Sequence, residues 1–180
     1  MINFEESALN FLRQNIRDIP DFPKPGIIFK DITPLLKNAD TLNLTSRLLA
    51  KPFLNKKVDL IVGLESRGFL FGTTLAMDLH AGFVPIRKPN KLPGETVSAT
   101  YQLEYGTDSV EIHADSIIRG NRVVIHDDLI ATGGTATAAT KLVEKLGGEV
   151  IGYSFILELT FLSGMKNLKE GALVHTLLKY

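Results

Sequence analysis

The sequence predicts an α/β fold in which a central, mainly parallel β-sheet is flanked by helices. Apolar runs of strand length alternate with segments that have the apolar spacing of a helix, and this alternation is typical of a parallel sheet. The expected strands are residues 59–64, 82–87, 122–126, 149–159 and 172–178. The expected helices are residues 68–80 and 134–146, with a short helix near 165–170.

Three other segments complete the predicted chain. Residues 3–18 have a helical spacing of apolar side chains, which are Phe4, Ala8, Phe11, Leu12 and Ile16. An extended loop is expected to follow, because three prolines and a glycine come in quick succession at Pro20, Pro23, Pro25 and Gly26. Residues 88–95 read as an exposed loop, and residues 96–113 alternate around Gly106 as in a hairpin, which would be a small antiparallel addition.

The composition narrows the class of protein. A length of 180 residues favours one domain, and 20 basic residues balance 20 acidic ones, which disfavours a general nucleic-acid binder. Without cysteine the chain has no disulfide, thiolate metal site or cysteine nucleophile. No apolar run is long enough to span a membrane, and the acidic, amphipathic N-terminus is unlike a signal peptide. We therefore expect a cytoplasmic globular protein that binds neither nucleic acid nor membrane.

Three unusual stretches follow predicted strands. They are residues 63–68, 87–91 and 127–135. Ligands of open parallel sheets bind outside the carboxyl ends of the strands, where all three stretches are expected to meet. Their coincidence predicts a ligand site more strongly than any one of them does alone.

The stretch Thr132-Gly133-Gly134-Thr135 precedes a predicted helix. Free N–H groups and the positive dipole end at a helix start bind anions, and glycine lets a phosphate come close to the backbone. The alternative is a plain strand-to-helix turn with threonine as its cap, which leaves the two glycines poorly explained. The pattern is neither a P-loop nor a dinucleotide-binding turn.

Two adjacent carboxylates, Asp127 and Asp128, precede this turn. A bare carboxylate close to a phosphate is repelled by about 4 kcal/mol at intermediate dielectric. Either a cation lies between them, or the carboxylates bind hydroxyl groups of the same ligand. A phosphorylated ribose that carries a diphosphate and Mg²⁺ satisfies both conditions. The alternative is that one aspartate caps the loop and the other is solvated.

The stretch VVIHDDLIATGGT (residues 123–135) resembles the 5-phosphoribosyl-diphosphate signature of the type I phosphoribosyltransferases. Four further stretches are similar, in order, to the adenine phosphoribosyltransferase family: DFPKPGIIFKDITPLL, GLESRGFLFG, IRKPNKLPGETVSATYQLEYG and ILELTFLSG. The resemblance implies a single domain over residues 1–180 with the type I phosphoribosyltransferase fold, a small N-terminal hood (residues 1–35) and a flexible hairpin lid (residues 88–107). It also implies a homodimer.

The resemblance further implies a glycosyltransferase reaction of purine salvage, in which adenine and 5-phosphoribosyl 1-diphosphate give AMP and diphosphate. The implied cradle of the 5′-phosphate is Ala131, Thr132, Gly133, Gly134 and Thr135. The implied ribose-binding acids are Asp127 and Asp128, and the implied diphosphate-binding cations are Arg67, Arg87, Lys88 and Lys91. Mg²⁺ is expected to be held mainly by the diphosphate, the ribose hydroxyls and water, with no direct protein ligand.

Five residues are assigned to adenine and its chemistry by the resemblance. Ile28, Phe29 and Lys30 match the adenine-contacting segment, with Phe29 expected to stack on the purine. Glu104 is the expected general acid/base, and Tyr105 is expected to aid the transition state or the diphosphate. Without the resemblance, Phe29 reads as ordinary core and Glu104 as a solvated hairpin carboxylate. Without the resemblance, Arg67 reads as a helix cap or ion-pair partner, and a solvated cluster is the alternative for Arg87, Lys88 and Lys91.

The chain departs from the family at Lys30, where arginine is frequent, and at His126, where an apolar residue is frequent. We interpret His126 as structural and expect it to point away from the face of Asp127. His80, His113 and His175 lack metal-ligand spacing. Ala131 stands where enzymes for 6-oxopurines usually carry an acid, which favours adenine over hypoxanthine or guanine. The rival functions are a non-catalytic sensor of phosphoribosyl diphosphate or nucleotides with the same fold and, less favoured, a structural or assembly protein.

Overall fold

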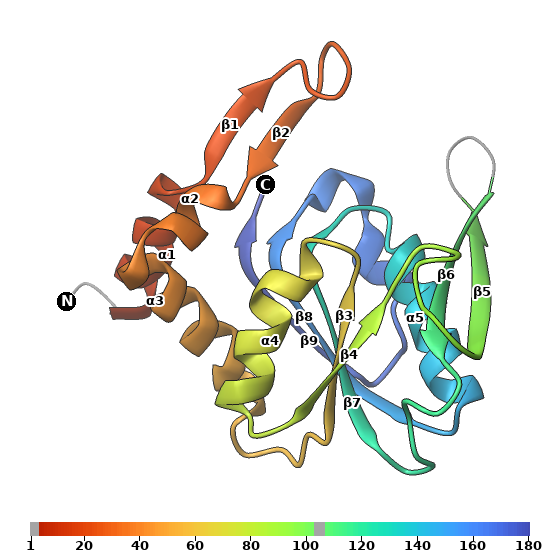
Figure 1. Cartoon of the computed structure of the whole chain (residues 1–180). Coiled ribbons are helices and arrows are strands. Elements are labelled where there is room, and N and C mark those ends of the chain that lie inside the picture. The colour runs from red at the N-terminus through yellow and green to blue at the C-terminus, as the bar shows by residue number, and fades with distance from the viewer. Residues whose placement is uncertain (1–3, 103–106) are drawn as a thin grey trace. The chain divides into compact units, whose positions relative to one another are not determined.

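The computed structural model describes residues 4–102 and 107–180, and the chain forms two compact units, residues 1–48 and 49–180 (Figure 1). The first unit contains α1 (Phe4–Gln14), β1 (Arg17–Pro20), β2 (Ile28–Asp31), α2 (Thr33–Lys37) and most of α3 (Ala39–Ala50). The second contains the 3₁₀ turn η1 (Lys51–Phe53), β3 (Leu60–Leu64), α4 (Gly68–Asp78), β4 (Gly82–Ile86), β5 (Thr96–Gln102), β6 (Thr107–His113), β7 (Arg122–Ile130), α5 (Gly134–Lys145), β8 (Glu149–Glu158), the 3₁₀ turns η2 (Thr160–Leu162) and η3 (Gly164–Asn167), and β9 (Leu173–Lys179).

The first unit contains a β-hairpin where the sequence predicted a helix end and an extended loop. Strands β1 and β2 pair antiparallel from Arg17 opposite Asp31 to Pro20 opposite Ile28. The predicted helix over residues 3–18 ran too far: α1 ends at Gln14, and residues 17–20 satisfy their backbone groups by strand pairing instead. The predicted loop is present, but it is confined to residues 21–27. The proline-rich stretch is the turn of this hairpin, in which the N–H of Gly26 donates to the Asp21 carboxylate at 2.7 Å.

Helices α2 and α3 were not predicted from the sequence. A cap precedes α3, because the Asn38 side-chain oxygen accepts hydrogen bonds from the N–H groups of Asp40 and Thr41 at 2.8 and 3.1 Å. Asparagine is among the favoured N-cap residues, so this start signal was present in the sequence.

The second unit is built on a five-stranded sheet in the order β4–β3–β7–β8–β9 (Figure 1). Every neighbouring pair is parallel, which confirms the predicted fold class. The chain moves outward from β3 to β4 on one side and from β7 through β8 to β9 on the other. The direction of winding therefore reverses between β3 and β7, which is the position where such sheets bind ligands.

The predicted helices of this unit are confirmed as α4 and α5. Helix α4 packs on β3, β4 and β7, and α5 packs on β7 and β8 and on the hairpin of β5 and β6. The apolar side of α5 is buried in the main core at Ala138, Ala139, Leu142 and Val143. The core thus fixes the position of the α5 N-terminus relative to the carboxyl ends of the strands.

Strands β5 and β6 form the predicted hairpin as a separate two-stranded antiparallel sheet. Val110 and Ile112 of β6 join the main core. Two hydrogen bonds hold the loop before the hairpin. The Arg87 guanidinium donates to the Lys91 carbonyl at 3.1 Å, and the His113 Nε2 atom lies 2.8 Å from the Pro93 carbonyl oxygen. The hairpin tip, residues 103–106, lies outside the described residues.

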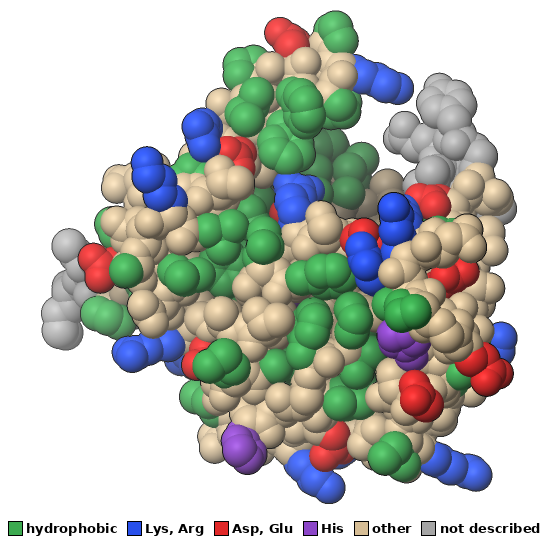
Figure 2. Space-filling view, in the orientation of Figure 1, with side chains coloured by type: hydrophobic (Ala, Val, Ile, Leu, Met, Phe, Trp, Pro, Cys, Tyr) green, Lys and Arg blue, Asp and Glu red, His purple; other side chains and the backbone are tan. Residues whose placement is uncertain are grey.

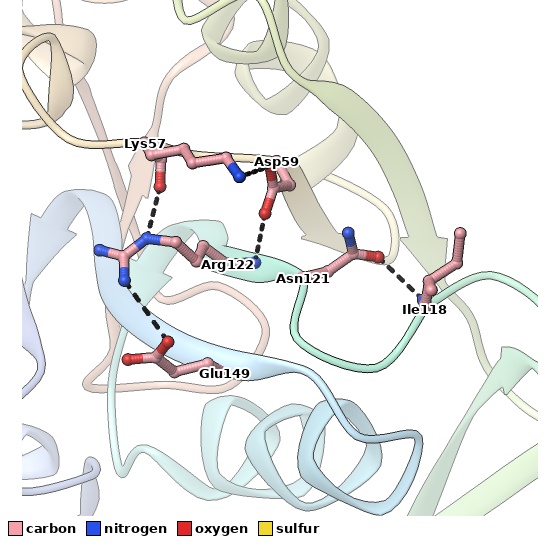
Figure 3. Close-up of polar contacts among 6 residues, drawn as sticks. All are labelled: Lys57, Asp59, Ile118, Asn121, Arg122 and Glu149. Atoms are coloured by element: carbon pink, nitrogen blue, oxygen red, sulfur yellow. Dashed lines mark hydrogen bonds and ion pairs between the residues drawn. The ribbon is translucent and has the colours of Figure 1, made fainter.

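A polar cluster ties the N-terminal ends of three strands together (Figure 3). The Arg122 N–H donates to the Asp59 carboxylate at 2.8 Å, and its guanidinium donates to the Lys57 carbonyl at 2.8 Å and to Glu149 at 3.4 Å. These residues stand at or just before the starts of β3, β7 and β8. The carboxyl ends of the strands, at the opposite edge, are left to form the ligand site.

Two predicted elements of this unit differ from the structure in more than a residue or two at their ends. Strand β7 continues to Ile130 rather than ending at residue 126, because its pairing with β8 extends to Ile130 opposite Glu158. The helix expected near 165–170 is instead the pair of 3₁₀ turns η2 and η3. None of the helices in the described ranges is both long and apolar enough to cross a membrane.

Candidate active site

A pocket lies at the carboxyl ends of β3 and β7, where the winding direction of the sheet reverses. Pairing of β3 with β7 stops at Gly63 opposite His126, so the last residues of β7 extend past β3. The turn after β3 lies beside these last residues of β7, and its Glu65–Ser66 peptide is cis. The residues that line the pocket are Leu64, Arg67, Phe155 and the stretch 127–136. The pocket brings Arg67, both aspartates and the whole predicted phosphate cradle together.

The cradle connects β7 to α5. Gly133 has φ +80°, which disfavours side-chain-bearing residues, and it stands at the N-cap of α5. The N–H of Thr137 bonds to the Gly133 carbonyl and closes the first turn. The N–H groups ahead of it belong to the helix start and have no intrahelical partner. Ala131, Thr132, Gly133, Gly134 and Thr135 all line the pocket, so this geometry suits an anion.

The two aspartates share the pocket with one cation. An Arg67 guanidinium nitrogen lies 3.2 Å from the Asp128 carboxylate, which is buried. Burial raises the pKa of Asp127 well above its ordinary value, and repulsion from Asp128 adds to this. Burial also raises the pKa of Asp128, although Arg67 opposes that shift. These carboxylates are held in an unfavourable setting that hydroxyl donors or a cation on a ligand would relieve.

Glu65 connects the Arg67 turn to the end of β4. Its carboxylate accepts hydrogen bonds from the Arg87 guanidinium at 2.8 Å and from the Lys88 N–H at 2.7 Å. The hydrogen bond from Arg87 holds the pKa of Glu65 below its ordinary value. Arg87 therefore has a structural partner in this conformation. Its predicted contact with diphosphate stays a prediction, and Lys91 is exposed beside it.

Lys88 is held at the hairpin. Its ammonium group bonds to the Asp108 carboxylate and, at 3.0 Å, to the Tyr101 hydroxyl, which itself donates to Asp108 at 3.0 Å. Burial alone would lower the pKa of Lys88, but the hydrogen bonds that Lys88 donates to Asp108 and Tyr101 outweigh it and raise the pKa. A diphosphate would have to replace these partners. Glu104 and Tyr105 lie outside the described residues, so their predicted roles stay predictions.

The residues expected to contact adenine lie on β2, in the first unit. Ile28 is exposed, Phe29 packs edge-to-face with Phe22 at 5.2 Å between ring centroids, and the Lys30 ammonium bonds to both oxygens of Asp18 across the hairpin. The Lys30 side chain is thus occupied within its own hairpin. Its backbone remains the part expected to read the base.

Sequence reasoning missed three residues that shape the site: Glu65, Gly164 and Asn167. Glu65 was seen only as part of the Arg67 turn. Gly164 and Asn167 contact the phosphate cradle from η3, about 30 residues further along the chain. The glycine in LSG after a buried strand was the one available signal for Gly164. Nothing local distinguishes Asn167.

His126 is buried beneath the site. Neither ring nitrogen has a hydrogen bond of normal geometry within the described residues, although the backbone of Ser154 slightly favours the charged form. Burial lowers the pKa of His126 to about 4. The ring lies beside Gly72 of α4, where an added Cβ atom would be 3.5 Å from His126 Cδ2. This environment supports the structural interpretation.

His126 should make the fold sensitive to acid. Its pKa is lower in the folded than in the unfolded chain, so the unfolded state binds more protons between pH 6.5 and 4, and the stability falls as the pH falls through that window. The variant H126L should lose this contribution, worth about 2 kcal/mol between pH 7 and pH 5. Urea unfolding of both proteins at the two pH values measures it. Equal losses of stability in the two proteins would contradict the assignment.

The site thus joins helix-start amides, paired carboxylates and an arginine at the point where the winding of a parallel sheet reverses, which is where α/β proteins of this class bind their ligands. Residues 32–158 match the phosphoribosyl transferase domain model. The adenine phosphoribosyltransferase of Koribacter versatilis is 56% identical over 169 residues, which cover 94% of this chain and 92% of the relative.

Solved structures agree. The adenine phosphoribosyltransferase of Rhodothermus marinus superposes with a TM-score of 0.93 at 54% identity, and covers 97% of this chain and 99% of its own. The Saccharomyces cerevisiae enzyme, solved with adenine and an imino-altritol bisphosphate, has a TM-score of 0.90 at 46% identity and covers 96% and 99% of the two chains. The chain belongs to the phosphoribosyl transferase domain family and, within it, to the adenine phosphoribosyltransferases.

Proposed function

We propose that the protein transfers the 5-phosphoribosyl group from 5-phosphoribosyl 1-diphosphate to adenine, giving AMP and diphosphate in purine salvage. The observation that carries the proposal is the pocket between the ends of β3 and β7. It brings together the N-terminus of α5 and the carboxylates of Asp127 and Asp128. A phosphate monoester and the hydroxyl groups of one ribose match this pair of features. The relatives named above carry the same activity in their names.

The cradle binds the 5′-phosphate through backbone N–H groups and threonine hydroxyls. Asp127 and Asp128 accept hydrogen bonds from the ribose hydroxyls, and this holds the sugar in place while the bond at its C1′ atom changes. The same bonds relieve the unfavourable burial of the two carboxylates. The carboxylates therefore repel a phosphate but attract the hydroxyl face of the same molecule, which orients the substrate.

Arg67 serves the diphosphate. Its side chain is 37% exposed and lines the pocket, and its guanidinium lies next to Asp128. As diphosphate leaves C1′, negative charge grows on its bridging oxygen, and a fixed cation stabilises that charge; one such donor is often worth about 3 kcal/mol. Ring nitrogen N9 of adenine bonds to C1′ as the bond between C1′ and the diphosphate oxygen breaks. Diphosphate leaves intact, and the N9 proton passes to Glu104, the proposed general base.

The side chains at the site fit Mg²⁺ only as a partner of the substrate. Asp127 and Asp128 are oxygen donors of the kind that Mg²⁺ accepts, but among the described residues no group of three His, Asp or Glu side chains could hold a metal ion. Diphosphate oxygens, ribose hydroxyls and water would complete the coordination. Bound in this way, Mg²⁺ neutralises charge on the leaving diphosphate.

Base selection rests on two features. Ala131 lines the pocket without offering a carboxylate to a 6-oxopurine. Ile28, Phe29 and Lys30 form the proposed adenine-binding segment, in which Phe29 stacks on the base and backbone groups read its edge.

The residues 88–107 act as the proposed lid, which carries Lys88 and Lys91 to the diphosphate and excludes water from the activated ribose.

We further expect a cytoplasmic homodimer. Helix α4 exposes two apolar side chains on one helical face, with Leu70 42% and Met77 80% exposed. Figure 2 shows hydrophobic side chains at the surface where α4 lies. Exposed apolar side chains that share a helix face suit a contact with a second copy. Light scattering on the eluting protein measures the mass: twice the chain mass of 19.8 kDa is expected, and a single chain mass at micromolar concentration would refute the dimer.

Diphosphate release tests the proposed function. The purified protein is mixed with 5-phosphoribosyl 1-diphosphate and Mg²⁺, and each purine or pyrimidine base is added in turn. Release with adenine alone is the expected result. Release with hypoxanthine or guanine would overturn the base assignment. Binding of the diphosphate without turnover of any base would favour the sensor with the same fold.

A further inference from the structure

We propose that Asn167 is a positioning residue that sets the orientation of the phosphate cradle. Its side chain holds the Thr132 carbonyl on the side of the loop away from the carboxylates. This inference rests on the proposed function, since it concerns how the cradle binds the 5′-phosphate. Asn167 would act through the loop and touch no substrate atom.

The hydrogen bonds join η3 to the cradle at two points. The Asn167 amide nitrogen donates to the Thr132 carbonyl at 2.8 Å. The Thr137 hydroxyl lies 2.9 Å from the Gly133 carbonyl and 3.0 Å from the Asn167 carbonyl, so one proton is placed between two acceptors. Asn167 thus binds the loop before the helix start and the first turn of α5 together.

Two cavities border the cradle. Asp127, Asp128 and Arg67 line the first cavity, whereas Asn167 and Thr137 line the second. Thr132 and Gly134 border both. The Thr132 carbonyl is therefore drawn toward the cavity without the carboxylates. In a trans peptide the carbonyl and the following N–H point in opposite directions, so the bond from Asn167 turns the Gly133 N–H away from the Asn167 side chain.

The loop needs such a restraint because Gly133 has φ +80°. Glycine accepts positive and negative φ almost equally, so the peptide before it has little intrinsic preference for one orientation. A rotated peptide would turn the Thr132 carbonyl toward the phosphate, where its negative end repels an anion, and would remove one donor. A bond from Asn167 to that carbonyl favours the anion-binding orientation.

Close packing supports the same function for η3. A Cβ atom placed on Gly164 would come within 2.2 Å of the Ala131 carbonyl oxygen, and one on Gly133 would come within 2.5 Å of the Gly164 carbonyl oxygen. The backbones of the turn and the cradle are therefore in direct contact. Gly164 allows this approach, and Asn167 supplies the polar link that selects the peptide orientation.

The test compares N167A with wild type in adenine-dependent diphosphate release and in AMP binding. Loss of one neutral hydrogen bond predicts a rise of about three- to tenfold in KM for 5-phosphoribosyl 1-diphosphate and in Kd for AMP. The turnover number at saturation and the KM for adenine should stay within twofold. N167D should weaken phosphate binding further, because a carboxylate cannot donate to the Thr132 carbonyl and adds negative charge.

N43A is the matched control. Asn43 is exposed on α3 and donates from the same side-chain nitrogen to the Ala39 carbonyl at 2.8 Å, outside the cradle. The KM for 5-phosphoribosyl 1-diphosphate and the Kd for AMP of this variant should equal those of wild type. Unchanged constants in N167A, or equal rises for adenine and phosphoribosyl diphosphate, would overturn the positioning role. Absence of wild-type turnover would count against the proposed function, while the ratio of AMP affinities would still decide the role of Asn167.

Discussion

Replacement of Asp127 by asparagine should make the protein more stable and much less active. The ribose hydroxyls lose a charged acceptor, and a hydrogen bond to a charged group is worth about 1.5–3 kcal/mol. The expected fall in kcat/KM is therefore about 10- to 150-fold. Stability should rise because the substitution removes a charge that is half-buried and repelled by Asp128.

The sign of the stability change follows from the raised pKa. A carboxyl group whose pKa is higher in the folded chain than in the unfolded one destabilises the fold at neutral pH. This loss of stability disappears as the pH falls below the pKa that the group has in the unfolded chain. D127N should therefore melt above wild type at pH 7 and lose this advantage near pH 3. In a domain of this size each kcal/mol gained raises the Tm by about 2–4 °C.

D128N provides the comparison. Asp128 is paired with Arg67 at 3.2 Å, so its removal leaves that cation without the carboxylate and should stabilise less than D127N. Calorimetry and initial rates on the same preparations measure both effects. A D127N protein that is less stable than wild type, or that keeps full activity, would contradict the role assigned to the pair.

Replacement of Glu104 by glutamine should lower kcat by about 10²- to 10⁴-fold, the range of general acid/base catalysis. Glutamine keeps the size and polarity of the side chain but cannot take the proton that N9 of adenine loses. Affinity for 5-phosphoribosyl 1-diphosphate should be nearly unchanged, because the cradle, Asp127 and Arg67 bind that substrate.

Glu95 offers a matched control at the base of the same hairpin, just before β5. E95Q removes one carboxylate from this part of the chain and should keep wild-type turnover. The decisive measurement is kcat together with the Kd for 5-phosphoribosyl 1-diphosphate in both variants. Equal loss of turnover and binding in E104Q would remove its assignment as the acid/base and indicate a role in the shape of the hairpin.

The local pattern of the sequence determined the central sheet, both flanking helices and the cradle. Buried parallel strands are continuous apolar runs, and α5 has a clear apolar spacing, so each element carries its own signal. Asp127, Asp128 and residues 131–135 are adjacent in the chain, and adjacency alone brings them to one site. The family resemblance then gave these residues their chemistry.

The first unit was harder to predict. Residues 17–20 continue the apolar spacing of α1, and only their pairing with residues 28–31 makes them a strand. The prolines correctly predicted a loop, but not that this loop is the turn of a hairpin. Strand pairing across a turn depends on the partner segment, which a local pattern does not contain.

By itself, the sequence determined the fold class and the run of residues that forms the phosphate cradle, because both depend on near neighbours in the chain. Only the tertiary structure decided the rest of the site. The pairing of Glu65 with Arg87 spans 22 residues, the bond between Lys88 and Asp108 spans 20, and the bond from Asn167 to Thr132 spans 35. Such contacts arise where packed elements meet, so no local spacing encodes them.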